Sequence, residues 1–302
     1  MVKTAYNWHR PLMLFTLSMV VLVPVAALGM LLDDRVLVDS PIWFKPFKFA
    51  VSFVLYSTSL AWFISLLEGR AHRIAWWLGT VAALVGVGEM AIIVGQVVRG
   101  KRSHFNFETP LDTALFSAMG TMVVILWVAN LIIALMLFRK KFDNPALGWT
   151  VRLSLLIALV GMGVGFLMTG PKPGQSIDKG VLGAHSIGGP DGGPTMPFTG
   201  WSTVYGDYRV GHFIGMHALQ ILPLLIFFAG RWANARLAWV LSGGYLGLTL
   251  LVIWQAMRAQ PLIKPDALTL ITAAAIVAAT ALGVVWARQS HDKNNNKELV
   301  TA

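Results

Sequence analysis

The residues of this sequence best suited to chemistry are four of its seven histidines: His104, His185, His212 and His217. Neutral imidazole is the commonest protein ligand for transition metals, and it also binds haem iron. The sequence has no cysteine, which excludes disulfides, thiolate metal sites and covalent attachment of a c-type haem. We therefore predict haem b or a transition metal as the cofactor. His217 would be one ligand, with His212, His104 or His185 as its partner.

The spacing of His212 and His217 restricts how the two could bind one metal ion. Successive residues turn a helix by about 100°, so two residues five apart point about 140° away from each other. These two histidines can share an ion only if the helix begins after His212, whereas His212 and Met216 share a face. The H-E-x-x-H pattern of zinc proteases is absent. The alternative is that these histidines hydrogen-bond between helices or cap a helix.

Glu89 is the only carboxylate deep within a predicted membrane span. It precedes Arg99 by ten residues, which places it roughly 15 Å below the outer end of its helix. An unpaired charge at this depth is costly, so the group must be protonated or paired. Two roles fit this position. Glu89 is either a catalytic proton relay or coupling site, or a neutral carboxylic acid that bridges two helices.

Lysine and arginine gather at the predicted outer boundary of the membrane. Among them, Arg99, Arg209 and Arg258 are predicted to hold the anionic groups of a cofactor or of a small anionic molecule. Guanidinium groups pair well with phosphates, carboxylates and haem propionates. Ordinary snorkelling of long side chains toward lipid headgroups is the alternative. The other members of this group are Lys45, Lys48, Lys101, Arg102 and Lys264.

The composition shows what kind of scaffold must position these residues. Hydrophobic residues make up 56% of the 302 residues and charged residues only 13%, about half of the roughly 25% typical of soluble domains. This composition predicts an integral membrane protein that has lipids as its surroundings. It excludes a soluble enzyme, a secreted domain and a nucleic-acid-binding protein, although the net charge is +10.

Eight apolar runs are long enough to cross a bilayer, whose core of about 30 Å needs about 20 helical residues. They are residues 11–32, 47–67, 73–98, 112–138, 150–170, 212–230, 236–257 and 266–287. Backbone polar groups cannot remain unpaired in lipid, so each run is predicted to be a helix. The alternation typical of a membrane barrel is absent. The predicted fold class is an all-α integral membrane protein with about eight transmembrane helices.

Eight spans place both termini on the same side of the membrane. With both ends in the cytoplasm, lysine and arginine are slightly in excess inside, and their densest group, Arg139-Lys140-Lys141, is cytoplasmic. We therefore predict a multi-pass protein of the bacterial inner membrane with both termini cytoplasmic. In this orientation the four candidate histidines lie on the outer side.

Short matches between the third and seventh spans indicate an internal repeat. Both spans begin with Arg-x-Ala-Trp, at Arg73 and at Arg236, and both end with Gln-x-x-Arg, at Gln96 and at Gln255. We predict two parallel four-helix repeats, and sites in such proteins tend to lie between the halves. The predicted domains are a first unit at 1–145, a second unit at 146–289 and a polar tail at 290–302.

The longest predicted loop, residues 171–211, leads directly into the sixth span. Its middle is rich in glycine and proline, which allow tight turns. Its second half carries Phe198, Trp201, Tyr205 and Tyr208, more aromatic bulk than a solvated linker needs. We predict a lid whose aromatic half plugs the outer site, because closing loops exclude water from many active sites. A flexible loop that touches the lipid headgroups is the alternative.

Two motifs carry a resemblance to known proteins: Ser103-His104-Phe105-Asn106 and Gly215-Met216-His217-Ala218-Leu219-Gln220. They resemble patterns in uncharacterised bacterial multi-spanning membrane proteins, and this resemblance implies no particular activity. The arrangement of four plus four helices with outer histidines is also similar in outline to haem A synthases. Only the architecture carries over, since the Glu-x-x-x-His-Arg motif and the loop cysteines of that family are missing.

Three functions stay open at the level of the sequence. The first is a membrane oxidoreductase whose site in the outer leaflet holds haem or a metal through His217. The second is a proton-coupled transporter of a small anionic or lipid-like substrate, in which Glu89 carries the proton between parallel repeats. The third is an assembly partner within a larger membrane complex. An optical spectrum of the purified protein separates the haem protein from the other classes.

Overall fold

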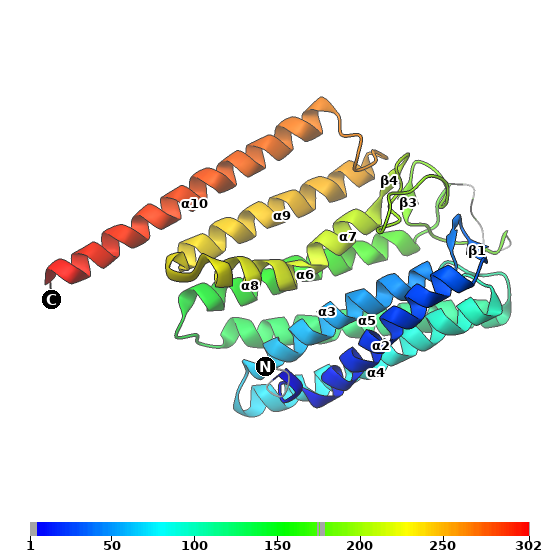
Figure 1. Cartoon of the computed structure of the whole chain (residues 1–302), viewed down its shortest axis with the longest axis horizontal. Coiled ribbons are helices and arrows are strands. Elements are labelled where there is room, and N and C mark those ends of the chain that lie inside the picture. Colours follow the sequence, from blue (N-terminus) through cyan, green and yellow to red (C-terminus); the bar gives the residue numbers. More distant parts are fainter. Residues whose placement is uncertain (1–4, 174, 176–178, 302) are drawn as a thin grey trace.

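The computed structural model describes residues 5–173, 175 and 179–301, with side chains described as far as residue 289. Helices dominate this part of the chain, and two short antiparallel sheets lie at one end of the helical bundle (Figure 1). One sheet pairs β1 (Val36–Leu37) with β2 (Ser40–Pro41), and the other pairs β3 (Ser186–Ile187) with β4 (Gly206–Asp207). The two chain termini lie toward the opposite end (Figure 1).

Seven helices of the described chain are long and apolar enough to cross a membrane. They are α2 (Arg10–Leu32), α3 (Phe44–Ser65), α4 (Gly69–Arg99), α5 (Pro110–Arg139), α6 (Pro145–Thr169), α9 (Ala235–Met257) and the first part of α10 (Ala267–Thr301). An eighth span results if α7 (Tyr208–Met216) and α8 (Ala218–Ala229) cross as one bent unit. The structure thus confirms an all-α, multi-pass membrane protein with about eight spans.

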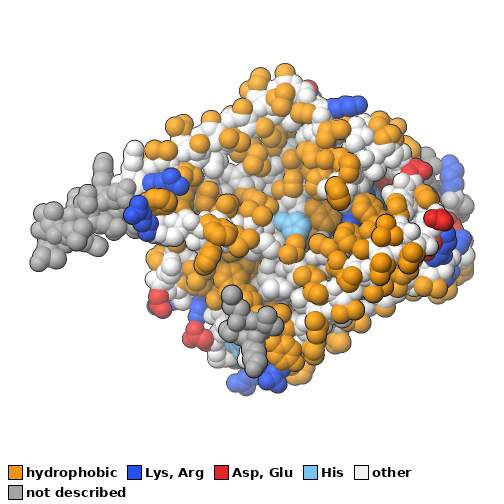
Figure 2. Space-filling view, in the orientation of Figure 1, with side chains coloured by type: hydrophobic (Ala, Val, Ile, Leu, Met, Phe, Trp, Pro, Cys, Tyr) orange, Lys and Arg blue, Asp and Glu red, His pale blue; other side chains and the backbone are white. Residues whose placement is uncertain are grey.

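The surface of the molecule suits a lipid environment. Apolar side chains cover most of the face shown in Figure 2, whereas charged side chains lie toward its two ends. On α2, for example, Leu31 and Leu32 are 78% and 80% exposed. Such a band is unfavourable in water and favourable in lipid. The kind of membrane and the orientation of the termini stay predictions.

Capping residues explain why some helices begin before their apolar runs. Thr109 and Asn144 each accept a hydrogen bond from a backbone N–H in the first helical turn, and a proline follows each of them. The side-chain oxygen satisfies a free N–H, and proline at the first helical position needs no hydrogen-bond acceptor. α5 and α6 therefore start at Pro110 and Pro145, two and five residues earlier than predicted.

The second span also starts earlier than predicted, at Phe44. A tight hairpin, β1–β2, precedes it, and the turn residues Val38 and Asp39 both have positive φ angles. Two such residues are typical of a two-residue hairpin turn. The hairpin leads almost directly into α3, so that Lys45 and Lys48 lie in the first turns of this helix.

The sixth span starts at Tyr208, four residues earlier than predicted, and is interrupted at His217 by a bend of 45°. Asp207 caps its start by accepting a hydrogen bond from a backbone N–H of the first turn. Close packing holds α7 against α6, because a Cβ placed on Gly161 or Gly215 would lie within 2.6 Å of the other glycine. After the bend, α8 contacts α3 in the other half of the molecule.

The helices form two groups with the same order of contacts (Figure 1). In the first group, α2 packs against α3 and α4, α3 against α4, and α4 against α5. In the second, α6 packs against α7, α8 and α9, the α7–α8 pair against α9, and α9 against α10. The groups meet where α5 contacts α6 and α3 contacts α8. A repeated four-helix unit would pack in this way, and both the repeat and the domain boundaries stay predictions.

The end of α4 is fixed by contacts that start from its Gln-x-x-Arg motif. Gln96 donates a hydrogen bond to the backbone oxygen of Arg102 at 3.0 Å. Arg99 forms an ion pair of 2.7 Å with Asp112 in the first turn of α5. Gly100 adopts the left-handed conformation that commonly ends a helix. These contacts set the direction in which the chain leaves α4.

The end of α9 repeats this arrangement. Gln255 donates to a backbone oxygen of the following loop at 2.9 Å, and Arg258 forms an ion pair of 2.5 Å with Asp266 just before α10. Ala259 takes the left-handed conformation found at the equivalent position after α4. In each half, the Gln-x-x-Arg motif therefore fixes the end of one helix to the following loop and to the start of the next helix. This similarity supports the predicted repeat and provides both arginines with carboxylate partners inside the chain.

Candidate functional site

Two neighbouring cavities lie between the halves of the bundle. The outer cavity, of about 290 Å³, is at the end that carries the hairpins. Its walls come from the β1–β2 hairpin, from α3, α4 and α7, and from the loops near residues 101–105 and 175–200. The inner cavity, of about 140 Å³, lies among α3, α5, α6, α7 and α8. These names follow the predicted orientation, in which the hairpin end of the bundle faces outward.

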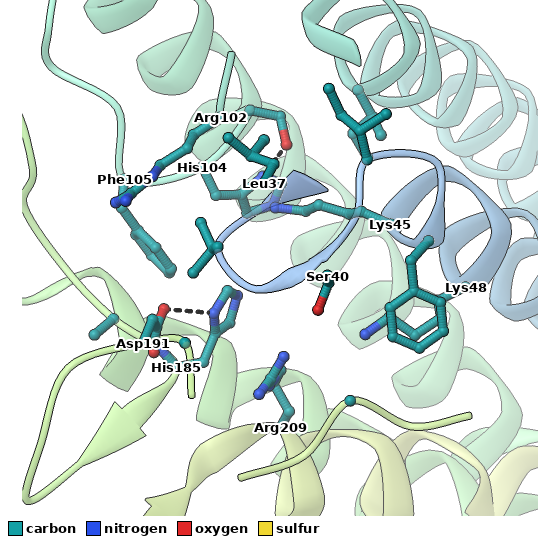
Figure 3. Close-up of a pocket in the computed structure, with 18 of the residues that line it drawn as sticks. Leu37, Ser40, Lys45, Lys48, Arg102, His104, Phe105, His185, Asp191 and Arg209 are labelled. Atoms are coloured by element: carbon teal, nitrogen blue, oxygen red, sulfur yellow. Dashed lines mark hydrogen bonds and ion pairs between the residues drawn. The ribbon is translucent and has the colours of Figure 1, made fainter. Parts of the chain in front are cut away.

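The outer cavity is strongly cationic. Among the described residues that line it, five are lysine or arginine, and Asp191 is the only one with a carboxylate. The five are Lys45, Lys48, Lys101, Arg102 and Arg209. Figure 3 shows Lys45 and Lys48 reaching the cavity from one side and Arg209 from another. An anion in this space would meet positive charge from both halves of the molecule.

The chain itself neutralises these cations to different extents. Arg209 pairs with the buried Asp207 at 2.6 Å, and Lys101 pairs with Glu108 at 2.7 Å. The ammonium group of Lys45, in contrast, makes no hydrogen bond or ion pair with the residues that the structure describes, although it lines the cavity. Lys45 is therefore the cation most available to an anionic ligand.

His185 and Asp191 form a hydrogen-bonded pair on the loop wall (Figure 3). The Nδ1–H group of His185 donates to the carboxylate of Asp191 at 2.7 Å, and the backbone N–H of Ser186 donates to the same carboxylate. Burial lowers the pKa of His185 to about 4. Burial alone would raise the pKa of Asp191, but these hydrogen bonds hold it well below its usual range. At neutral pH the pair is a neutral imidazole beside a carboxylate.

His104 lines the same cavity as His185. Burial lowers the pKa of His104 well below its usual value, so this imidazole is also neutral at pH 7. The backbone oxygen of the next residue, Phe105, accepts a hydrogen bond from the N–H of Leu182 at 3.3 Å. The Ser-His-Phe-Asn motif therefore joins the loop after α4 to the long loop that forms the opposite wall.

The inner cavity is mainly apolar and is lined by the other two candidate histidines, His212 and His217. Nδ1 of His212 lies 2.8 Å from the backbone oxygen of Gly161, and Nδ1 of His217 lies 3.1 Å from Oε1 of Gln220. Both acceptors are oxygens, so each neutral ring carries its proton on Nδ1 and leaves Nε2 unprotonated. The bend at His217 allows both rings to reach one cavity, which a regular helix would not permit.

The described residues contain no group of three or more His, Cys, Asp or Glu that could hold a metal ion. His212 and His217 share a cavity, but they have no third ligand of these types in that part of the chain. At about 140 Å³, the cavity is also smaller than the roughly 300–1,000 Å³ of pockets that hold drug-sized molecules. Binding of haem b or a metal stays a prediction that rests on the histidine pair.

Phe49 and Phe213 line both cavities, so their rings lie at the boundary between them. Phe49 follows Lys45 by four residues on α3, and Phe213 follows Arg209 by four residues on α7. Residues four apart lie above one another on a helix. Each half therefore places a cation in the outer cavity and an aromatic ring directly below it.

Glu89 lies just beyond the part of α4 that lines the outer cavity. It is 2% exposed, and its Oε1 has no hydrogen-bond partner among the described residues. Ile93 and Val97 follow it by one and two turns and line the cavity, so Glu89 continues the same face of the helix. A hydrogen-bonded bridge to another helix, the alternative for Glu89, is not seen in the described chain.

The structure separates the three arginines that were predicted to bind anions. Arg209 lines the outer cavity, whereas Arg99 and Arg258 line neither cavity of the described chain and are held by carboxylates at the helix ends. The reason is the repeated Gln-x-x-Arg arrangement, which uses both guanidinium groups structurally. Lys45 and Lys48, two of the other cations at the predicted membrane boundary, line the cavity together with Arg209.

The prediction of an aromatic plug is wrong. The long loop forms a wall of the outer cavity through its glycine-rich half, which includes Gly183 and Gly192. None of the four predicted plug residues lines either cavity of the described chain, and Phe198 is 90% exposed. A loop that forms the wall of a cavity leaves most room for a ligand at its glycines, because glycine has no side chain. Residues 174 and 176–178 of this loop lie outside the described residues.

The residues at these cavities that matter most and were not predicted from the sequence are Phe49, Phe213 and Asp191. The four-residue spacing of the two phenylalanines from Lys45 and Arg209 was a usable signal for the first pair. Asp191 gave no comparable signal, because its contact with His185 depends on the path of an irregular loop.

The fold and the cavities together define the class of this protein. It is a polytopic helical membrane protein with a cationic cavity at one end, bordered by two phenylalanine rings that also line an apolar cavity between its halves. Comparison with family models, with curated proteins and with solved structures gives no match. The chemistry of the two cavities is therefore what indicates the function.

Proposed function

We propose that this protein is a proton-coupled transporter of an anionic substrate that is small or lipid-like. The observation that carries the proposal is the cationic outer cavity, which adjoins an apolar cavity between the halves. Transporters built from repeats bind their substrates at the interface between the repeats. With both termini in the cytoplasm of a bacterial cell, the substrate would reach the outer cavity from outside the inner membrane.

Electrostatics supports an anion as the substrate. The ammonium group of Lys45 has no acidic partner at hydrogen-bond distance in the described chain, and Lys48 donates only to the backbone oxygen of Thr199, at 3.0 Å. Attraction between opposite charges is stronger in a partly buried site than in water. His104 and His185 are neutral and add polar ring atoms without cancelling the positive charge. The cavity therefore suits a phosphate, sulfate or carboxylate group.

Glu89 provides a means of coupling substrate binding to protons. Glu89 is buried beside the outer cavity, and its Oε1 has no hydrogen-bond partner among the described residues. An anion bound in the cavity adds negative charge above Glu89, which favours the protonated form of this carboxyl group. Substrate and proton are then carried together, and no direct contact between Glu89 and the substrate is needed. Proton release on the other side of the membrane would restore the starting state.

Uptake by reconstituted protein tests this proposal. Proteoliposomes of phosphatidylcholine are given radiolabelled hexyl phosphate, with or without an acidic outer solution. We expect the proton gradient to drive accumulation by the wild type and by Glu68→Gln, a control at a side chain that is 84% exposed. Glu89→Gln should bind hexyl phosphate but lose the gradient-driven part of uptake. Accumulation no higher than in protein-free vesicles would refute transport, and equal accumulation by Glu89→Gln would refute the coupling.

The histidine pair favours a second candidate function, a membrane oxidoreductase with haem or a metal bound by His212 and His217. Both rings line one cavity with Nε2 unprotonated, and both Nδ1 atoms are fixed by hydrogen bonds. Metal-binding histidines commonly have their second nitrogen fixed in this way. Optical spectra of the oxidised and dithionite-reduced protein, with elemental analysis, decide the question. A protein with neither a Soret band nor stoichiometric metal is not this oxidoreductase.

A further inference from the structure

We propose that the substrate is a single-chain anionic amphiphile, with its headgroup in the outer cavity and its apolar chain in the inner cavity. This inference rests on the proposed function, because it names the substrate class of the same site. It also goes beyond that function, since a small inorganic anion would occupy the outer cavity alone. The two cavities and the boundary between them carry the inference.

One face of α3 connects the two cavities. Lys45, Phe49, Phe53 and Tyr56 follow one another at intervals of four, four and three residues, and so they form a row on this helix. The row begins at the cation in the outer cavity and ends at the tyrosine in the inner cavity. At a rise of about 1.5 Å per residue, its length is about 16 Å. A ligand that contacts both ends must be elongated.

α7 provides the facing wall with the same order of side chains. Arg209 lines the outer cavity, Phe213 lines both cavities, and Met216 lines the inner one. α3 and α7 belong to different halves of the molecule. The path between the halves is therefore charged at its outer end, aromatic in the middle and apolar below, which is the polarity pattern of an amphiphile.

The inner cavity suits an alkyl chain better than a second polar group. Its apolar walls include Val123, Leu126, Trp127, Met162 and Leu219. The hydrogen-bond donors of its histidines and glutamine are already engaged, since His212 and His217 are hydrogen-bonded through Nδ1, and Gln220 donates to Ser59 of α3 at 2.8 Å. The Nε2 atoms are acceptors and do not attract an anionic group. An apolar chain gains free energy by leaving water, whereas a charged headgroup would lose its hydration there.

The dimensions favour one chain of limited length. The inner cavity of about 140 Å³ is about half as large as the outer cavity of about 290 Å³. A phospholipid with two long chains would have to leave most of its apolar part outside the cavity. The substrate class that fits both spaces is a headgroup such as phosphate or sulfate on a single alkyl or similar chain.

A series of alkyl phosphates from ethyl to octyl phosphate tests this inference. The full-length protein in phosphatidylcholine nanodiscs is titrated with each compound, and binding to empty nanodiscs is subtracted. We expect the affinity to rise about fourfold for each added methylene group, which corresponds to about 0.8 kcal/mol, until the inner cavity is filled. The alcohols of the same length and inorganic phosphate serve as probes of the chain alone and of the anion alone. Both should bind more weakly than octyl phosphate.

Variants of the inner cavity locate the chain. Met162→Trp narrows the cavity, so it should remove the gain in affinity from butyl to octyl phosphate and change the affinity for ethyl phosphate less than twofold. Met162→Leu is the matched control and should keep the full gain. Val123→Phe narrows the cavity from α5 and provides a second test if the tryptophan variant does not fold. Both positions line the inner cavity and not the outer one.

The outcomes separate this inference from the proposed function. The proposal that the substrate is an amphiphile would be overturned if the wild type bound ethyl and octyl phosphate with equal affinity. It would also be overturned if both narrowed variants kept the full gain in affinity with chain length. Binding of anions as such would then still stand. Alcohols that bind as tightly as the phosphates would overturn the assignment of the headgroup. If no phosphate binds at all, the proposed function itself is wrong.

Discussion

The outer and inner cavities share two phenylalanine rings but differ in nearly everything else. The outer cavity lies where loops meet the helix ends, and its walls hold five cations, two neutral histidines and one carboxylate. The inner cavity lies among helices, and its lining contains two hydrogen-bonded histidines among apolar side chains. The cations thus lie at the hairpin end of the bundle, and the described lining of the inner cavity contains no lysine, arginine or acidic side chain.

Because of this difference, the path between the halves can bind an anion at its outer end and an apolar group in the inner cavity. A charge is costly within the membrane unless it is paired, so an anion is best held at the outer end. Apolar surface is best buried in the inner cavity, where no headgroup has to lose its hydration. Three substitutions and one change of pH test this difference between the two cavities.

The largest expected effect is the destabilisation of the outer wall by Asp207→Asn. Asp207 is 2% exposed, pairs with Arg209 and accepts a hydrogen bond from the N–H of Ser202. Removal of its charge leaves the guanidinium group without its partner, and loss of one member of a buried pair typically costs about 3–5 kcal/mol. Thermal unfolding followed by circular dichroism should show the loss.

The control for this prediction is Asp266→Asn. Its ion pair with Arg258 is more than one third exposed on both sides, and exposed pairs contribute little to stability. A much smaller change in melting temperature is expected. Equal destabilisation by the two substitutions would contradict the idea that buried charge pairs hold the outer wall.

Acidification should weaken the outer wall before it affects the inner cavity. Burial lowers the pKa of His185 to about 4, below its usual value of 6.5. Between these two values the unfolded chain binds a proton that the folded chain does not, so stability falls as the pH drops from about 6.5 to 4. The total loss is at most about 3 kcal/mol. The protection factors of the amides around residues 183–193, which are corrected for the pH dependence of intrinsic exchange, should be lower at pH 5 than at pH 7.

The histidine itself can be tested by His185→Gln. This variant lacks the titrating group, so the protection factors of the loop amides should depend much less on pH than in the wild type. An unchanged pH dependence would show that another group controls the outer wall.

The next effect is on binding. Lys45→Gln should lower the affinity for ethyl phosphate about tenfold to a hundredfold, because a hydrogen bond to a charged group contributes about 1.5–3 kcal/mol. Lys101→Gln is the matched control, since Lys101 lines the same cavity but is already paired with Glu108. Its affinity should change by less than about twofold. The same loss in both variants would mean that only the total charge of the cavity matters.

The smallest effect is expected in the inner cavity. Tyr56 accepts a hydrogen bond from Asn130, and Tyr56→Phe removes it at a cost of about 1 kcal/mol of stability. The affinity for ethyl phosphate should not change, because Tyr56 lines the inner cavity and not the outer one. A clear loss of ethyl phosphate binding would show that the two cavities do not act separately.

Much of the fold was predictable because the backbone can adopt few conformations inside a lipid bilayer. Apolar runs of the required length must be helices, and α2 and α9 follow their runs to within one residue, whereas α4 begins four residues before its run. The bend at His217 was not predictable, since the apolar run continues through it from α7 into α8. Contacts between distant segments determine such a break, and periodicity along one helix does not report them.

The site was only partly predictable, for a related reason. The four candidate histidines could be selected by residue type, but the fold places two of them at the outer cavity and two at the inner cavity. The Gln-x-x-Arg match was recognised, yet the structural role of Arg99 and Arg258 appeared only when their carboxylate partners were in place. The type of a residue indicates which chemistry its side chain could perform. Its contacts in the folded protein decide whether the side chain is free to perform it.

The central claim is that anion binding at Lys45 is coupled to proton uptake by Glu89. Hexyl sulfate is a suitable probe, because the ligand itself does not titrate near neutral pH. Its calorimetric titration into the nanodisc-bound protein, in two buffers of different ionisation enthalpy, gives the number of protons taken up on binding. Proton uptake requires that Glu89 is ionised in the free protein, so we expect the uptake by the wild type to rise toward one proton as the pH of the titration is raised. Glu89→Gln should still bind the probe and take up none. Equal proton uptake by the two proteins, or binding by the wild type with no uptake at any pH, would contradict the claim.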